Sequence, residues 1–377
     1  CLLSLYLFIL AINKKKNVYW FLIPVLLGFS FLSKQAPTVY VIFLITVLSI
    51  IFFIRSKNIS SFISALVGSI TVLILFFILL FLGGIKFNDF IIQYFSYPMS
   101  LGGSRFDWLF PFEFKRIIWR YKLQYLSIAI LIYLFIKFSF QNKRGLFSDY
   151  LIIISIIIFC LLTVTHQLMT INAIFIYCLI PIFCGFSHIY SKRYLKKEKI
   201  IGRFLIALTL CSTVYYYFNY VKNRTFMDLR DVSLENSIDG EKVHSKLSNI
   251  KWITMFYPND PAKEAANIKL ALKILEEDKN KKMIITDYQF ISVFLKQYDF
   301  SPTRFWYDFH GYPTQKSVYF NYWKEFVLNK IEKNNIKNIY ILKPLHGETK
   351  PLENVLKNCY QKQIFSETFY KLALNNC

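Results

Sequence analysis

Apolar and polar positions divide the chain into two parts with different patterns. In the first 219 residues, long apolar runs alternate with short polar connections. About 20 consecutive apolar residues cross a bilayer core as a helix. A buried helix of a soluble protein would explain any one of these runs, but not the whole set. The pattern predicts about eight spans, at 1–12, 18–33, 37–54, 60–84, 123–138, 149–165, 171–190 and 201–219. The first is short, so we expect the chain to begin within a span.

Residues 220–377 have a mixed, amphipathic pattern instead. The stretch "PAKEAANIKLALKILEEDK" (261–279) spaces apolar residues at three and four positions, which is typical of a helix. The β-rich runs at 282–286 and 336–343 indicate strands, and the apolar–polar alternation at the C-terminus indicates a hairpin. Further helices are expected at 288–297, 319–334 and 351–358. This part is therefore predicted to be a small α/β domain.

Charge follows the same division and predicts an orientation. The formal net charge is +22, and only five of the 23 acidic residues lie in 1–219. If connection 13–17 is cytoplasmic, the connections on that side carry 14 Lys and Arg, against seven on the other side. Since cytoplasmic connections are the more basic, residues 220–377 are predicted to be extracytoplasmic. A basic stripe on one domain is missing, so no nucleic-acid partner is expected.

Cysteine positions agree with an oxidising compartment for the C-terminal part. Five of the seven cysteines lie in the predicted spans, where Cys behaves as a small apolar residue. Cys359 and Cys377 flank the predicted hairpin, whose ends meet, so a disulfide between them would suit an extracytoplasmic domain. Two unpaired thiols are the alternative. Heavy use of Ile, Lys, Asn, Phe and Tyr suggests an AT-rich, bacterial genome, so we expect an integral protein of the bacterial inner membrane.

Lys34 is the first candidate for function in the membrane part. It lies in "GFSFLSKQAPTVYV" (28–41), between two apolar runs and three residues before Pro37. A lysine at the outer ends of two helices can reach a phosphate at the level of the lipid headgroups, and ionisable residues near a span often mark function. The alternative is an interfacial lysine that extends its ammonium group to water.

The long connection 85–122 is the second candidate, because long loops usually carry function. Its "LGGSR" offers backbone amides beside Arg105 as an anion site. Residues 113–122 mix cations with apolar residues, which predicts an amphipathic helix in the interface. Those cations would attract the phosphate of a lipid carrier or, more simply, anionic headgroups.

Two further stretches carry polar groups with alternative interpretations. "THQLMTIN" (165–172) is predicted to be a tight outer turn whose His166, Gln167 and Asn172 bind a polar ligand between spans. His166 could equally be a plain interfacial residue. In the C-terminal domain, "SPTRFWYDFHGYPTQ" (301–315) combines aromatic and polar residues, as sugar-binding loops do. A loop packed against the membrane part or the membrane surface is the simpler interpretation.

Motifs of soluble enzymes are missing from the sequence. It contains no Gly-x-Gly-x-x-Gly, no Gly-Lys-Ser/Thr loop and no Cys or His pair at metal-ligand spacing. We therefore identify no cofactor and no metal ligands from the sequence, and a divalent metal ion stays open.

The stretch "IPVLLGFSFLSKQAPTVYVIFLI" (23–45) resembles the pattern Gly-Leu-x-x-Leu-Ser/Thr-Lys of membrane glycosyltransferases with the GT-C fold. That superfamily includes protein O-mannosyltransferases, aminoarabinose transferases and the RgtA/B/C/D-like group. The overall plan is also similar, with many spans, outer loops and a C-terminal extracytoplasmic α/β domain. The sequence-level likeness is limited to this one short motif.

The resemblance implies a function for Lys34. In the family, the matching lysine contacts the phosphate of a polyprenyl-phosphate-sugar donor, and the acceptor is a glycan, a lipid or a protein. A cation there would also stabilise negative charge on the phosphate as the sugar leaves. The family's catalytic base is an acid, often paired, in the first outer loop, and no acidic pair occurs in 1–219. We therefore expect the acid pair upstream of Cys1 and no catalytic acid in this chain.

Two other functions stay open. An envelope polysaccharide polymerase or ligase also has many spans, and it would use an Arg and a His in outer loops, for which Arg105 and His166 are candidates. A transporter would show internal repeats and paired broken helices, and we find no repeat in the spans.

Overall fold

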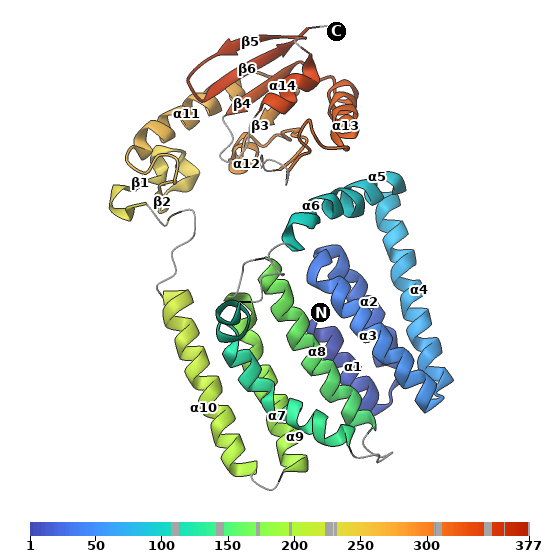
Figure 1. Ribbon diagram of the computed structural model, residues 1–377. Coiled ribbons are helices and arrows are strands. Elements are labelled where there is room, and N and C mark those ends of the chain that lie inside the picture. Colours follow the sequence, from blue (N-terminus) through green and yellow to red (C-terminus); the bar gives the residue numbers. More distant parts are fainter. Residues whose placement is uncertain are drawn as a thin grey trace. The chain divides into compact units, whose positions relative to one another are not determined.

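The computed structural model contains two compact units, Cys1–Arg224 and Thr225–Cys377 (Figure 1). The division lies close to the boundary expected near residue 220. The structure describes residues 1–106, 113–140, 147–170, 174–195, 198–222, 229, 232–304, 306, 311–342, 349–357 and 359–375, without the side chains of 102–106, 174 and 175.

The first unit is a bundle of apolar helices. Its main helices are α1 (Leu2–Lys14), α2 (Asn17–Ser33), α3 (Gln35–Ser56), α4 (Ile59–Leu82), α7 (Lys122–Ser139), α8 (Phe147–Met169), α9 (Ile180–Tyr194) and α10 (Glu198–Tyr217). Each overlaps one predicted span. Within the described residues, five stretches are long and apolar enough to cross a membrane, namely α3, α4, α7, α8 and Glu198–Lys222, while α1 and α2 are shorter apolar helices. A helical unit with several helices long and apolar enough to span a membrane is therefore confirmed.

The span expected at 171–190 differs from its prediction. A 3₁₀-helix covers Ile174–Leu179, and α9 starts only at Ile180. Pro181 occupies the first turn of α9, where its missing N–H costs nothing, and a proline at that position marks a helix start rather than an interior.

Helix α2 packs closely against both α1 and α4. At Gly68 of α4, an added Cβ would lie 2.2 Å from the carbonyl oxygen of Phe21, and at Gly28 of α2 it would lie 2.2 Å from a methyl group of Val72. Small residues let helix backbones approach in apolar surroundings, where van der Waals packing drives association. These two glycines therefore set the spacing of α2 and α4.

The described residues of this connection, 85–106 and 113–122, are mostly helical and do not form a loop. They form α5 (Phe87–Ile91), a π-helical turn (Ile92–Ser96), α6 (Tyr97–Phe106) and a second π-helical turn (Lys115–Trp119). Phe114 and Trp119 are exposed, and the Lys122 ammonium lies 3.6 Å from the centre of the Trp119 ring. Exposed aromatic rings beside cations agree with an interfacial position for 113–122.

The second unit is a small α/β domain. Its helices are α11 (Pro261–Glu277), α12 (Phe290–Leu295), α13 (Phe320–Lys333) and α14 (Lys350–Leu356), each within or near a predicted helix. Its main strands are β3 (Lys282–Ile285), β4 (Asn338–Leu342), β5 (Tyr360–Ile364) and β6 (Phe369–Leu374), and short strands β1 (Ile238–Asp239) and β2 (Lys251–Trp252) pair separately. The strand order is β3-β4-β6-β5, parallel between β3 and β4 and otherwise antiparallel.

Alternate side chains of the central strands enter two different cores. Ile339 and Ile341 of β4 pack with residues of α13 and α14, whereas Tyr340 and Leu342 pack with residues of α11 and α12. Because successive side chains of a strand point to opposite faces, helices cover both faces of the sheet. The predicted hairpin is present as β5 and β6. Cys359, just before it, is disulfide-bonded, while Cys377 lies outside the described residues, so their pairing stays a prediction.

Candidate functional site

Lys34 occupies the corner between α2 and α3. Its backbone is extended, and its N–H donates to the Ser30 carbonyl at 2.9 Å, which ends α2. The backbone is again non-helical at Ala36, before Pro37, and only then does α3 continue regularly. The Lys34 side chain is exposed. The helix breaker thus forms a corner that presents one ammonium group at the end of the bundle.

Contacts among small polar side chains stabilise this corner. The Ser30 and Thr38 hydroxyls are 3.0 Å apart, and the Cys1 Sγ lies 3.1 Å from the first and 3.2 Å from the second. Thr38 is buried. These contacts join the ends of α1, α2 and α3, so the backbone that carries Lys34 is held from three helices.

The segment after α5 also packs on the corner. The Tyr94 hydroxyl donates to the Phe31 carbonyl, and the Gln35 amide donates to the Tyr94 carbonyl. The Phe31 ring contacts the rings of Tyr94 and Phe95, with centroids 5.5 and 5.6 Å apart. The beginning of the predicted functional connection therefore lies beside Lys34.

The C-terminal end of α8 lies at the same end of the bundle. Tyr40, less than two turns after Lys34 on α3, donates from its hydroxyl to the Met169 Sδ at 3.6 Å. His166 and Gln167 belong to the last turns of α8 and are only 5% and 6% exposed. The prediction of a tight outer turn is therefore wrong for these two residues. Polar side chains in an apolar run resemble a turn in sequence, but here the helix continues to Met169 and buries them.

Buried polar groups without partners accompany Gln167. The Gln124 side chain on α7 is fully buried, and neither its amide oxygen nor its nitrogen has a hydrogen-bond partner in the described structure. The same holds for the hydroxyl of Tyr121, which is 1% exposed, and for the Gln167 Oε1. Helix α7 begins at the end where α8 finishes, because the two form an antiparallel pair (Figure 1). The three residues are therefore at the Lys34 end.

Unpartnered buried polar groups are rare and need an explanation. An amide has two donors and a carbonyl oxygen with two lone pairs, and leaving these unmet typically costs about 1–3 kcal/mol. A ligand with hydroxyl groups, or water that such a ligand displaces, would satisfy them. Sequence reasoning missed Tyr121 and Gln124, although a glutamine in the first turn of an apolar span is itself a signal.

The side chains of two further predicted residues, Arg105 and Asn172, are not described by the structure. Arg105 lies in α6, and its side chain is not among those described. The interpretation of "LGGSR" as exposed loop amides is wrong, since these residues are helical and helix N–H groups bond within the helix. Asn172 lies outside the described residues. Among the residues described, no three His, Cys, Asp or Glu side chains are placed to hold a metal ion.

The aromatic stretch 301–315 has a structural role where the structure describes it. Trp306 and Tyr312 are buried in the core of the second unit, and the Tyr312 ring lies between Trp306 and Trp323, with centroids at 5.1 and 5.8 Å. For Trp306 and Tyr312, the sugar-binding and the membrane-packing interpretations are therefore both wrong. Asp308 and His310 lie outside the described residues.

A buried carboxylate of the second unit is fully partnered. Glu264 on α11 is 1% exposed and accepts hydrogen bonds from Trp252 Nε1 at 2.9 Å, from the Thr254 hydroxyl at 3.0 Å and from the Tyr288 hydroxyl. Burial and the Glu264 carboxylate raise the pKa of Tyr288. These bonds tie β2 and the end of β3 to α11, which is a structural role.

Comparison with known proteins adds no assignment. No protein-family model matches the chain, no curated protein matches it, and no solved structure matches it.

Proposed function

We propose that the first unit binds the donor of an extracytoplasmic membrane glycosyltransferase, a sugar linked to a polyprenyl phosphate, for transfer to a glycan, lipid or protein acceptor. The observation that carries the proposal is a set of polar groups at one end of the bundle. The exposed Lys34 ammonium lies at that end, and so do the buried Tyr121 hydroxyl, Gln124 amide and Gln167 Oε1, which have no hydrogen-bond partner among the described residues. The ammonium group suits a phosphate, and the buried hydroxyl and amide groups suit sugar hydroxyls.

The phosphate would pair with Lys34 at the level of the headgroups. Charge-assisted hydrogen bonds between an ammonium group and phosphate oxygens are short and strong. Val39 and Phe43, on the following turns of α3, are large and exposed, and in a bilayer they face lipid. An isoprenoid tail could lie along them while the phosphate stays at the corner.

Buried amide and hydroxyl side chains would bind the sugar. Each sugar hydroxyl both donates and accepts, which matches the amide groups of Gln124 and Gln167 and the hydroxyl of Tyr121. These residues orient a donor, and none of them is suited to accept the acceptor's proton at neutral pH. The proposed role is therefore donor binding and positioning.

The polymerase alternative depends on a histidine in an outer loop. His166 lies instead in the last turns of α8 and is buried. That position suits hydrogen bonding between helices more than chemistry in a loop. The glycosyltransferase proposal requires no histidine in a loop.

Binding of a short-chain polyprenyl phosphate to the purified chain in detergent tests the proposal. Lys34→Gln should weaken binding about tenfold or more, since a hydrogen bond to a charged group contributes roughly 1.5–3 kcal/mol. Lys14→Gln, an exposed lysine in the last turn of α1, is the matched control and should bind like the wild type. Equal binding by wild type and Lys34→Gln would reject the proposal.

A further inference from the structure

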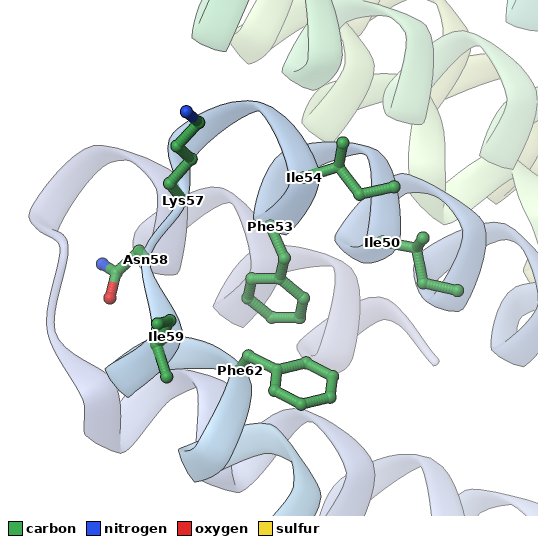
Figure 2. A pocket seen from close by; sticks show the side chains of 7 residues that line it. All are labelled: Ile50, Phe53, Ile54, Lys57, Asn58, Ile59 and Phe62. Atoms are coloured by element: carbon green, nitrogen blue, oxygen red, sulfur yellow. The ribbon is translucent and has the colours of Figure 1, made fainter.

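A second lipid-facing feature lies at the turn between α3 and α4. An open groove with a volume of about 260 Å³ is lined by the apolar side chains of Ile50, Phe53, Ile54, Ile59 and Phe62. Figure 2 shows the Phe53 and Phe62 rings side by side in it, and their centroids are 5.7 Å apart at nearly right angles. Ile54 and Ile59 are about 70% exposed. In a bilayer, this groove is open to acyl chains.

The turn above the groove carries a cation. Lys57 has a left-handed backbone, and its N–H donates to the Phe53 carbonyl at 2.9 Å, which ends α3. Asn58 starts α4, since its side chain accepts from the Ser61 N–H at 3.1 Å. Figure 2 shows the Lys57 side chain rising from the turn, with its ammonium group directed away from the two rings. A cation thus stands at the rim of an apolar groove.

The neighbouring α1–α2 connection adds further cations, and no acidic residue is close in sequence. Asn17 at the start of α2 bonds to Ser60 and Ser61 at the start of α4, at 2.5 and 3.1 Å, so the α1–α2 connection with Lys14, Lys15 and Lys16 meets the α3–α4 turn. The sequence has no Asp or Glu before Asp89. Asp149, at the start of α8, is already paired with Arg193 at 2.8 Å.

This end is distinct from the donor site. Lys34 and Lys57 flank opposite ends of α3, which has 22 residues and is therefore roughly 33 Å long. The two cations face opposite membrane surfaces. By the distribution of Lys and Arg, the Lys57 end is the cytoplasmic one, where anionic lipids create a negative surface potential.

We propose that the groove between α3 and α4 binds one anionic glycerophospholipid. Its phosphate pairs with Lys57 at the rim, and one acyl chain lies against Phe53 and Phe62. Charge complementarity selects an anionic headgroup over a zwitterionic one, and the apolar lining selects a lipid over free phosphate. The site does not depend on the proposed glycosyltransferase function.

Lipid binding to the detergent-solubilised chain, followed by native mass spectrometry, tests this site. Phosphatidylglycerol should bind the wild type at least tenfold more tightly than phosphatidylcholine, and Lys57→Gln should lose most of that difference. Arg55→Gln is the matched control. It removes the same charge two residues away, but the Arg55 guanidinium lies over the Phe147 ring of α8, 4.9 Å from its centre, and not at the groove. Lys57→Arg, which keeps the charge, should keep the preference.

Three results would overturn the proposal. Equal losses for Lys57→Gln and Arg55→Gln would show a diffuse attraction to the basic surface. Equal binding of the two lipids by the wild type would remove the charge requirement. Displacement of phosphatidylglycerol by millimolar inorganic phosphate alone would show that the acyl chain makes no contribution.

Discussion

Two clusters of buried polar side chains, one in each unit, differ in how their hydrogen bonds are met. Glu264 of the second unit is surrounded by three donors, from Trp252, Thr254 and Tyr288. In the membrane unit, Gln124 is equally buried, yet neither atom of its amide is partnered in the described structure.

Under the proposed function, the difference separates polar groups that stabilise the fold from polar groups that a bound ligand would satisfy. A saturated cluster stabilises its own fold, whereas an unsaturated one lowers stability until something binds. Within the described part of the chain, the indole N–H groups of Trp306 and Trp323 also have no partner, but each is a single donor on a large apolar ring. An amide has four hydrogen-bonding positions to satisfy, so the cost at Gln124 is larger.

Loss of the saturated carboxylate should have the largest effect. Glu264→Ala leaves three buried donors without an acceptor, and we expect it to lower the free energy of unfolding of the second unit by about 3 kcal/mol or more. Hydrogen exchange of α11 and residues 252–254 in the full chain measures this. Glu276→Ala, at an exposed position of the same helix, is the control and should change stability by less than about 0.5 kcal/mol. Unchanged exchange in Glu264→Ala would contradict the structural role.

Loss of the Gln124 amide, which has unmet hydrogen bonds, should change stability in the opposite direction. Gln124→Leu removes unmet polar groups and should raise the stability of the membrane unit by about 1–3 kcal/mol, seen as a higher midpoint of thermal unfolding in detergent. The same variant should bind the polyprenyl phosphate-linked sugar more weakly. A lower midpoint would mean that the amide has a partner in the folded protein, and the comparison would fail.

Asp278 is a third case, a half-buried carboxylate whose contribution to stability should depend on pH. Burial alone would raise the pKa of Asp278, but hydrogen bonds from the Asn280 N–H at 2.9 Å, the Asn338 side chain at 2.8 Å and the Tyr340 hydroxyl at 2.9 Å outweigh it, and the pKa lies below its ordinary 3.8. Since the folded pKa is the lower one, Asp278 stabilises the fold at neutral pH, and that contribution disappears as pH falls below 3.8.

Hydrogen exchange across β4, measured at pH values on both sides of 3.8, checks this third prediction. Protection of the wild type should fall in acid, and Asp278→Asn should lose part of that dependence. An identical acid dependence in both proteins would exclude Asp278 as its source.

The smallest effect on stability is expected at Lys34. Its side chain is exposed, so Lys34→Gln should change the thermal midpoint of the membrane unit very little, corresponding to less than about 0.5 kcal/mol, while it weakens phosphate binding. A large loss of stability would mean that the lysine supports the corner itself and would confound any binding result.

Periodicity predicted most of the helices and strands correctly but not the site. Long apolar runs are strong signals, so the span expected at 60–84 is α4, Ile59–Leu82, and the helix expected at 319–334 is α13, Phe320–Lys333. The glycines of "LGGSR" suggested a loop, although α6 includes them. Burial of Tyr121 and Gln124 depends on how α7 meets α8, which a single sequence does not contain.

Photo-crosslinking tests the central claim, that the Lys34 end of the bundle binds a lipid-linked phosphate. A polyprenyl phosphate with a photoreactive group beside the phosphate would be added to the purified chain and the labelled peptides mapped. We expect labels near Lys34, Tyr94, Tyr121 and the end of α8, and fewer labels in Lys34→Gln. Labels confined to the α3–α4 turn around Lys57, or unchanged labelling in Lys34→Gln, would contradict the account.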